Sequence, residues 1–346
     1  MKRVLLGMSG GVDSSVSAIL LLKQGYEVVG VTFKMFDESN ASIDAKRVAD
    51  KLGIKHFEYD CTNTFQKYVK DYFANSYKNL ETPNPCIECN KYLKFGLMYQ
   101  LAKENNCEYI ATGHYASTVD NKTYGHKVIA RIPSKKDQTY VLYKIKKEVL
   151  DYIVFPLAPY ESKDEIRAIA KENNLDIASK PDSEDICFIP DGDYKKYLLN
   201  NTDIKNKEGD IVLKDGSVLG KHQGLFRYTI GQRKGLGISY PHPLFVLDFN
   251  PKKNQLIVGP KEDLYKKEIV VTNVNYHFNE DFQDGLKVKV KIRYAAPLVD
   301  AYLYHSNQDV KVVFDEAQAS PTPGQGAVFY LDNYLMGGGK ISRIQN

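Results

Sequence analysis

Short apolar runs and amphipathic stretches alternate along the first two-thirds of the chain. A short apolar run predicts a buried strand, and a longer stretch with apolar residues at helical spacing predicts a helix. The expected strands are Val4–Met8, Val28–Phe33, His56–Tyr59 and Tyr109–Thr112, and the expected helices are Val16–Gln24, Asp44–Leu52, Phe65–Asn79 and Phe95–Asn105. Strands separated by helices of this length indicate an α/β fold with a doubly wound parallel sheet.

A capping box and a polar stretch mark the end of this alternating pattern. Ser162, followed three residues later by Glu165, predicts the start of a helix that runs to about Asn173. Residues 200–208 are almost all polar, which is typical of a linker. We therefore expect the α/β domain to cover residues 1–199.

Short strands and turns replace helices beyond this linker. Asp215-Gly216 predicts a hairpin turn, and residues 250–254 separate the two strands of a second expected hairpin, Phe245–Phe249 and Gln255–Val258. Alternating runs continue towards the end of the chain, among them Lys287–Ile292, Val310–Phe314 and Ala327–Leu331. This pattern predicts a small, mostly-β central domain over residues 200–264 and a β-barrel or sandwich over residues 265–346.

Composition places the chain among ordinary globular proteins. It has 346 residues, of which 43% are hydrophobic and 26% charged, enough for two or three domains with their own cores. The apolar run after Lys2-Arg3 is too short for a signal peptide, and no stretch has the length of a transmembrane helix. Five cysteines without a signal peptide do not predict a disulfide framework. We expect a cytoplasmic protein with reduced thiols and no membrane partner, and the net charge of +4 permits a nucleic-acid partner without indicating one.

The first candidate site is the segment Ser9–Ser15, Ser-Gly-Gly-Val-Asp-Ser-Ser, between the first expected strand and the first expected helix. Two glycines allow a tight turn with positive φ, and the N–H groups of the turn and of the helix start then favour an anion such as a polyphosphate. The side chains of Asp13, Ser14 and Ser15 can cap the helix. Phe33 and Gly113-His114 also fall at carboxyl ends of expected strands, where α/β sheets bind ligands. An ordinary capped turn is the alternative, but the strand–glycine–helix order favours a nucleotide site.

The second candidate site is the proline-rich segment Thr82–Lys91, which contains Cys86-Ile87-Glu88-Cys89. A Cys-x-x-Cys pair is common in structural zinc sites and in redox sites. Zinc requires further ligands, and the chain has no second cysteine pair. Cys187 is the other cysteine in comparable surroundings, whereas Cys61 and Cys107 have the apolar or helical neighbours of inert core residues.

These motifs occur in an order that resembles one enzyme family along essentially the whole chain. The segment Ser9–Ser15 resembles the PP-loop of ATP pyrophosphatases, which cleave ATP between its α- and β-phosphates, and we call it the PP-loop from here on. The full set is similar to that of the bacterial tRNA-specific 2-thiouridylases, which place sulfur at C2 of the wobble uridine. The motifs are Ser9–Ser15, Thr82–Lys91, Ala111–Tyr115, Lys136–Gln138, Ile186–Ile189, Gly220–Gly224, Thr229–Gly237 and Gly337–Gly339. The resemblance implies a PP-loop (HUP-type) catalytic domain, a central domain that contacts tRNA and a C-terminal β-barrel.

The resemblance also implies a role for each matching residue. It makes Cys89 the catalytic nucleophile and Cys187 the persulfide carrier. The implied ATP site consists of Gly7, Met8, Ser9, Gly10, Gly11, Val12, Asp13, Ser14, Phe33 and Gly113, with Mg²⁺ beside the ATP. Asn84, Pro85 and Cys86 would shape the pocket for the flipped base. His114, Lys136, Asp137, Gln138, Arg293, Tyr294 and Gln325 would meet the tRNA, and Arg227, Arg233 and Lys234 form a basic cluster suited to phosphates.

The reaction implied by the resemblance has two halves. The uridine O2 attacks the α-phosphorus of ATP, and the PP-loop stabilises the departing pyrophosphate. Sulfur carried on Cys187 then replaces AMP at C2, and Cys89 forms a disulfide with Cys187; nearby Lys91 is a candidate for lowering the pKa of Cys89. The implied partners are the anticodon loops of the Lys, Glu and Gln tRNAs, whose base must leave its stack, and a cysteine desulfurase or sulfur-relay protein as donor.

One departure from the family pattern leaves a second mechanism open. Many relatives carry an acidic residue where this chain has Cys86. Cys86, Cys89 and Cys187 would supply three thiolates, the set that holds a [4Fe–4S] cluster with one open iron. Cys86 would otherwise be a second resolving cysteine or a tolerated neighbour. Two further classes remain open, an amide-forming PP-loop ligase and an RNA-binding module without catalysis.

Overall fold

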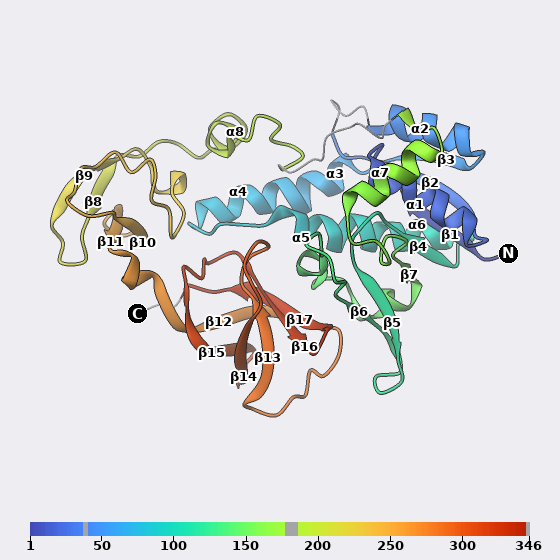
Figure 1. Ribbon diagram of the computed structural model, residues 1–346. Coiled ribbons are helices and arrows are strands. Elements are labelled where there is room, and N and C mark those ends of the chain that lie inside the picture. Colours follow the sequence, from blue (N-terminus) through green and yellow to red (C-terminus); the bar gives the residue numbers. More distant parts are fainter. Residues whose placement is uncertain (37–40, 177–185, 344–346) are drawn as a thin grey trace.

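The structure, a computed structural model, describes residues 1–36, 41–176 and 186–343 (Figure 1). Its N-terminal part is built on a five-stranded sheet in which all neighbouring strands are parallel, in the order β3-β2-β1-β4-β7. The strands are β1 (Arg3–Gly7), β2 (Glu27–Lys34), β3 (Lys55–Asp60), β4 (Tyr109–Ala111) and β7 (Ile153–Val154). The predicted α/β fold and its four expected strands are confirmed.

Both faces of this sheet are buried along its central strands, β1, β2 and β4, as is typical of a parallel sheet. Side chains alternate along β1, so Val4 and Leu6 pack in one apolar cluster and Leu5 in the other. The first cluster includes residues of α1 (Val12–Lys23), α2 (Ala41–Leu52) and α7 (Lys163–Glu172), and the second includes residues of α6 (Met98–Glu104). The capping box predicted at Ser162 and Glu165 is present at the start of α7.

Two of the predicted helices are longer than expected and contain π-helical turns. The first consists of α3 (Thr62–Phe65), η1 (Gln66–Lys70) and α4 (Asp71–Lys78), and the second of α5 (Pro85–Cys89), η2 (Asn90–Leu97) and α6. The second therefore begins ten residues before the expected Phe95. Pro85 occupies the first turn, where a missing N–H costs nothing, and the Asn84 side chain accepts from the Cys86 N–H at 3.2 Å. Pro85 of the proline-rich segment thus starts a helix.

The central part of the chain forms a four-stranded sheet in the order β10-β11-β8-β9, at the left of Figure 1. Its strands are β8 (Gly209–Val212), β9 (Val218–His222), β10 (Phe245–Asn250) and β11 (Gln255–Gly259). β8 pairs with β9 and β10 with β11 in antiparallel fashion, which confirms both predicted hairpins. Helix α8 (Tyr194–Asn201) precedes this sheet, and the turn η6 (Leu225–Arg227) follows β9.

The last strands close into a six-stranded barrel, which confirms the predicted C-terminal β-barrel. Pairing between β12 and β17 closes the sheet that runs in the order β12-β15-β14-β13-β16-β17. The strands are β12 (Tyr265–Tyr276), β13 (Leu286–Lys291), β14 (Val299–Ser306), β15 (Asp309–Ala319), β16 (Gly326–Leu331) and β17 (Tyr334–Ile341), preceded by the turn η7 (Lys261–Leu264). In the described part of the chain, no helix has the length and apolar character needed to cross a membrane.

A hairpin from the N-terminal half of the chain joins this barrel. Strands β5 (Ser117–Asn121) and β6 (His126–Ala130) follow β4, and Ala130 pairs with Tyr334 of β17. The short helices η3 (Thr139–Leu142) and η4 (Lys147–Tyr152) lead back to the parallel sheet. Tyr143 follows η3 and accepts a hydrogen bond at its carbonyl from Asn275 Nδ2 of β12, 2.7 Å away. The barrel is therefore attached to the sheet that carries the PP-loop.

Candidate functional site

A cavity of about 820 Å³, which we call the central cavity, lies at the carboxyl ends of β1, β2 and β4. Most of the predicted site residues line it, although they come from seven separate stretches of the chain. The lining includes Gly7, Met8, Ser9, Gly11, Val12, Asp13, Ser14, Phe33, Asn84, Pro85, Cys86, Gly113, His114, Lys136, Gln138, Tyr294 and Gln325. Gly10, Cys89, Asp137, Cys187 and Arg293 are not part of this lining.

The PP-loop turns sharply at Gly10, whose φ of 69° lies in the left-handed region. Helix α1 then starts after Gly11 without any hydrogen bond from a capping side chain, so the expected capping by Asp13, Ser14 or Ser15 is wrong. The hydroxyls of Ser14 and Ser15 instead donate to the Gly11 carbonyl, at 3.1 and 2.9 Å. The N-terminus of α1 therefore lies at the cavity without a side-chain N-cap.

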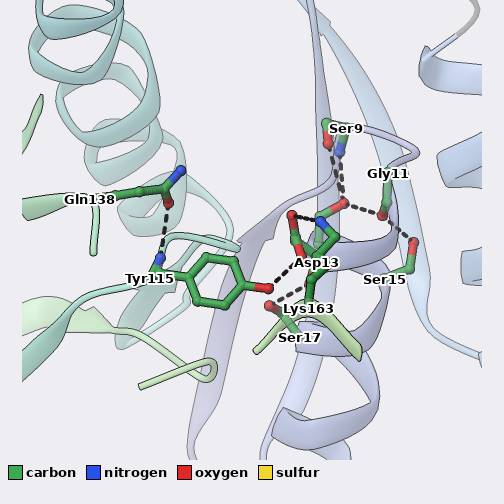
Figure 2. A network of polar contacts seen from close by, with 9 residues as sticks. Ser9, Gly11, Asp13, Ser15, Ser17, Tyr115, Gln138 and Lys163 are labelled. Atoms are coloured by element: carbon green, nitrogen blue, oxygen red, sulfur yellow. Dashed lines mark hydrogen bonds and ion pairs between the residues drawn. The ribbon is translucent and has the colours of Figure 1, made fainter. Parts of the chain in front are cut away.

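Asp13 is the centre of a polar network that ties the PP-loop to two other segments (Figure 2). The Tyr115 hydroxyl donates to Asp13 Oδ1 at 2.9 Å, and Lys163 Nζ forms an ion pair with Asp13 Oδ2 at 2.5 Å. The Tyr115 N–H donates to Gln138 Oε1 at 2.9 Å, which brings in the segment 136–138. Lys163 also lines the central cavity, so a cation and the PP-loop carboxylate share the wall of the expected phosphate site.

Two of the residues expected to meet tRNA are buried. His114 hydrogen-bonds through Nδ1 with Thr112 Oγ1 at 2.7 Å, and burial, aided by Lys94, holds its pKa well below the usual value, so it is neutral. The Asp137 carboxylate accepts from Thr139 Oγ1 at 2.6 Å and from the Ile132 N–H at 3.0 Å. Asp137 therefore holds its own loop, and the neighbouring Lys136 and Gln138 face the cavity.

Arg293 and Gln325 connect the barrel to the other parts of the chain. The Arg293 guanidinium donates to the Ser320 carbonyl at 2.6 Å and to Thr322 Oγ1 at 2.5 Å, with a longer contact of 3.5 Å to the Ile230 carbonyl in the central part of the chain. Gln325 Nε2 donates to the Thr82 carbonyl at 2.7 Å, directly before the cysteine motif. The barrel thereby positions both the segment Thr82–Lys91 and the loop that contains Ile230.

Helix α5 presents its two cysteines to different surroundings. Cys86 is exposed and lines the central cavity, whereas Cys89 is buried in an apolar cluster with Phe188 and Cys61. Burial raises the pKa of Cys89 to about 12, and Lys94 opposes this shift. Glu88 lies between the two cysteines, and its buried carboxylate forms an ion pair with Lys144 that holds helix α5 in place.

Cys187 is exposed, and its charge contributes to raising the pKa of Cys89. Partial desolvation and then the nearby Cys86 raise the pKa of Cys187, and Lys94 again opposes the shift. Lys91, the expected cation, lies over the Tyr92 ring, with Nζ 4.9 Å from its centroid. The cation that lowers the pKa of both thiols is therefore Lys94 rather than Lys91.

The three cysteines do not form a ready-made cluster site in the described ranges. There, no group of three or more His, Cys, Asp or Glu side chains is arranged to hold a metal ion. The arrangement of the three thiols seen in these ranges does not fit a [4Fe–4S] cluster. Cys61 and Cys107 are buried, as expected for core residues.

Sequence reasoning missed several residues of the cavity wall, chiefly Lys94, Tyr115 and Lys163. Tyr115 was within a recognised motif but had no role, and Lys163 was only the residue after a helix cap. A lysine in the first turn of a helix is unfavourable for the helix dipole, and this was the available signal that Lys163 has another purpose.

Comparison with known proteins accounts for nearly the whole chain. Residues 2–191 match the family model described as the tRNA methyl transferase HUP domain, residues 196–260 the tRNA methyl transferase PRC-barrel domain, and residues 266–341 the aminomethyltransferase beta-barrel domain. The tRNA-specific 2-thiouridylase MnmA of Clostridioides difficile is 43% identical over 356 residues, which are 99% of this chain and 98% of that protein. The proteins of the same name from Clostridium botulinum (44% identical; 99% and 98% covered) and Halothermothrix orenii (42%; 99% and 99%) are similarly close.

Proposed function

The chain belongs to the family of tRNA-specific 2-thiouridylases and is a tRNA sulfurtransferase with a PP-loop ATP-binding fold, and on this basis we propose that it exchanges the C2 oxygen of the wobble uridine for sulfur at the expense of ATP. One observation carries the proposal. The PP-loop, the cysteine helix α5 and the segment 136–138 line one central cavity of about 820 Å³. A nucleotide and a flipped base can therefore meet beside Cys86 and close to the other two thiols.

The PP-loop would perform the first half of the reaction. The uridine O2 attacks the α-phosphorus of ATP, the bond to the β-phosphate breaks, and pyrophosphate leaves. The turn at Gly10 and the uncapped N-terminus of α1 direct backbone N–H groups at the departing charge. Lys163 adds a positive charge at the same wall while holding Asp13 in place. Mg²⁺ would accompany the ATP phosphates.

The cysteines would perform the second half. A cysteine desulfurase or sulfur-relay protein loads Cys187 with a persulfide, whose terminal sulfur attacks C2 of the adenylated base and expels AMP. The Cys89 thiolate then attacks Cys187 Sγ, so the bond between Cys187 Sγ and the transferred sulfur breaks and a Cys89–Cys187 disulfide forms. The electron pair of the broken bond stays on the transferred sulfur, and 2-thiouridine leaves. A reductant must afterwards return the disulfide to two thiols.

Contacts with the tRNA would come from the cavity rim and from the central part of the chain. Lys136, Tyr294 and Gln325 line the cavity, and Asn84-Pro85-Cys86 would enclose the flipped base. Arg233 and Lys234 are exposed on the loop that follows the turn η6, where they can reach phosphates. We assign residues 1–199 to catalysis, 200–264 to tRNA contacts and 265–346 to docking, with the Lys, Glu and Gln tRNAs as substrates.

The decisive assay measures pyrophosphate release from ATP with and without tRNA. We expect release to depend on unmodified tRNA and to be matched by 2-thiouridine at the wobble position when a desulfurase and cysteine are supplied. An amide-forming ligase would need an acid and an amine instead, and a pure RNA-binding module would release no pyrophosphate. Wobble uridines that keep their sulfur in a strain lacking this gene would contradict the proposal.

The persulfide mechanism has its own test in Cys86→Asp. A relay between Cys187 and Cys89 needs no thiol at position 86, so aerobically purified Cys86→Asp should thiolate tRNA at nearly the parental rate. Anaerobic purification that yields about four irons per chain, with activity that follows iron content, would instead favour the cluster mechanism.

A further inference from the structure

Lys94 occupies a position that the π-helical turn η2 creates. Residues four and five apart lie on the same side of a π-helix, because its hydrogen bonds span five residues. Asn90, Lys94 and Met98 line the central cavity, and Lys94 follows Cys89 by five residues. The register thus brings one ammonium group both to the cavity and to the buried thiol.

Lys94 differs from its neighbours in having no acidic partner within the described residues. Lys163 pairs with Asp13 and Lys144 pairs with Glu88, but no carboxylate in those ranges lies within ion-pair distance of Lys94 Nζ. The side chain is nevertheless half-buried. A half-buried charge without a partner is costly, so an anion that arrives beside Lys94 would offset this cost.

The titratable groups whose pKa values respond to this ammonium include the two thiols of the proposed sulfur transfer. Cys89 of α5 and Cys187 both respond to its charge, and so does the buried His114 after β4. Cys86 and Cys61 are the other titratable neighbours of Cys89. Burial raises the pKa of Cys89 and Lys94 lowers it, so Lys94 is the cation that favours sulfur anions here.

We propose that Lys94 is the counter-ion of the reacting sulfur, an inference that rests on the proposed thiolation. Its ammonium would neutralise the terminal sulfur anion of the Cys187 persulfide before that sulfur attacks C2. It would then neutralise the Cys89 thiolate, which needs a counter-charge in an apolar cluster before it attacks Cys187 Sγ. Lys94 itself neither gains nor loses a bond in either step. The same charge would repel a protonated His114 and keep that ring neutral.

The test compares the alkylation of Cys187 by iodoacetate, which is an anion, with alkylation by the neutral iodoacetamide. Both reagents need the thiolate, so the ratio of their rates at Cys187, measured by peptide mass spectrometry, reports the local potential and not the extent of ionisation. We expect Lys94→Met to lower this ratio by about threefold to tenfold, in keeping with the loss of one partly screened charge. Lys94→Arg should restore the ratio, and the matched control Lys91→Met should leave it at the parental value.

The chemistry has a separate readout, the amount of 2-thiouridine formed per pyrophosphate released. Lys94→Met should lower that yield and Lys94→Arg should recover it, with circular dichroism confirming that both variants are folded. An alkylation ratio that is unchanged in Lys94→Met, or that falls equally in Lys91→Met, would overturn the counter-ion role. A shifted ratio in an enzyme whose parent forms no 2-thiouridine would overturn the proposed function instead.

Discussion

Gly113→Ala is a sharp test of how closely the loop after β4 packs on the PP-loop helix. A Cβ at residue 113 would lie 2.9 Å from the Ser14 backbone nitrogen, 3.0 Å from the Asp13 carbonyl carbon and 3.1 Å from Asp13 Cβ. Ordinary van der Waals contact begins at 3.4 Å, so each of these contacts is too short by a few tenths of an ångström. Two of the three atoms are backbone, and neither can rotate away.

The size of the effect on ATP binding depends on which atoms move to relieve the strain. Overpacking by a single carbon costs about 1–3 kcal/mol in a well-packed region. The first turn of α1 bears the N–H groups proposed to bind phosphate, and a shift there moves them away from the ATP. Because about 1.4 kcal/mol corresponds to a tenfold change in affinity, we expect ATP to bind about tenfold to a hundredfold more weakly.

Calorimetric titration with ATP in the absence of tRNA measures this loss of affinity directly. Thermal unfolding measures how far the strain lowers the stability of the whole protein. Gly220→Ala is the matched control, since its added Cβ would meet a side-chain methyl of Ile238 at 2.9 Å, in the central part of the chain. That control should bind ATP like the parent. If Gly113→Ala also bound ATP like the parent and unfolded at the same temperature, the close packing of this loop on α1 would be refuted.

Three further predictions concern other parts of the site. Asp13→Ala should abolish tRNA-dependent pyrophosphate release, because the carboxylate that contacts both Lys163 and Tyr115 is lost. Tyr115→Phe removes one hydrogen bond of 2.9 Å and should slow release by about tenfold at most; equal loss in both variants would contradict this ranking. Arg293→Ala should weaken tRNA binding and leave ATP affinity unchanged. A flatter salt dependence of tRNA binding would indicate that a phosphate contact is lost, rather than only the hydrogen bond to Ser320. Burial lowers the pKa of His277 from 6.5 to about 4. Between these two pH values the folded state therefore binds fewer protons than the unfolded state. The free energy of unfolding should fall as the pH drops through this window. His277→Asn should remove up to about 3 kcal/mol of that acid dependence in urea titrations, at 1.36 kcal/mol per pKa unit, and an unchanged dependence would contradict the assignment.

Local pattern was sufficient for much of the fold. The four expected strands, the capping box at Ser162 and the hairpin at Asp215-Gly216 are all encoded within a few neighbouring residues, so each could be predicted. The start of α5 could not, because prolines favour both loops and first turns of helices and only the cap from Asn84 distinguishes them. The hairpin of β5 and β6 also escaped prediction, since its barrel partner Tyr334 lies some 200 residues further along the chain.

The candidate site likewise combines features that contiguous motifs predict with features that depend on distant parts of the chain. The PP-loop and the residues around Cys86 were predicted from contiguous motifs, and the structure brings them to one cavity. The partnership of Asp13 with Lys163 joins positions 150 residues apart, and no local pattern reveals it. The choice between Lys91 and Lys94 depended on the π-helical register, which an α-helical spacing does not predict. The buried Asp137 carboxylate accepts a hydrogen bond from Thr139, and this orientation depends on packing that the motif around Asp137 does not predict.

The central claim, that ATP activation and sulfur transfer are separate steps with Cys187 as the sulfur carrier, is tested most directly by Cys187→Ser. Pyrophosphate release and 2-thiouridine are measured in the same reaction with tRNA, ATP, a cysteine desulfurase and cysteine, and Cys61→Ser serves as a control thiol that is buried nearby. We predict that Cys187→Ser still releases pyrophosphate in a tRNA-dependent manner and forms no 2-thiouridine. Formation of 2-thiouridine by Cys187→Ser at the parental rate would contradict the account.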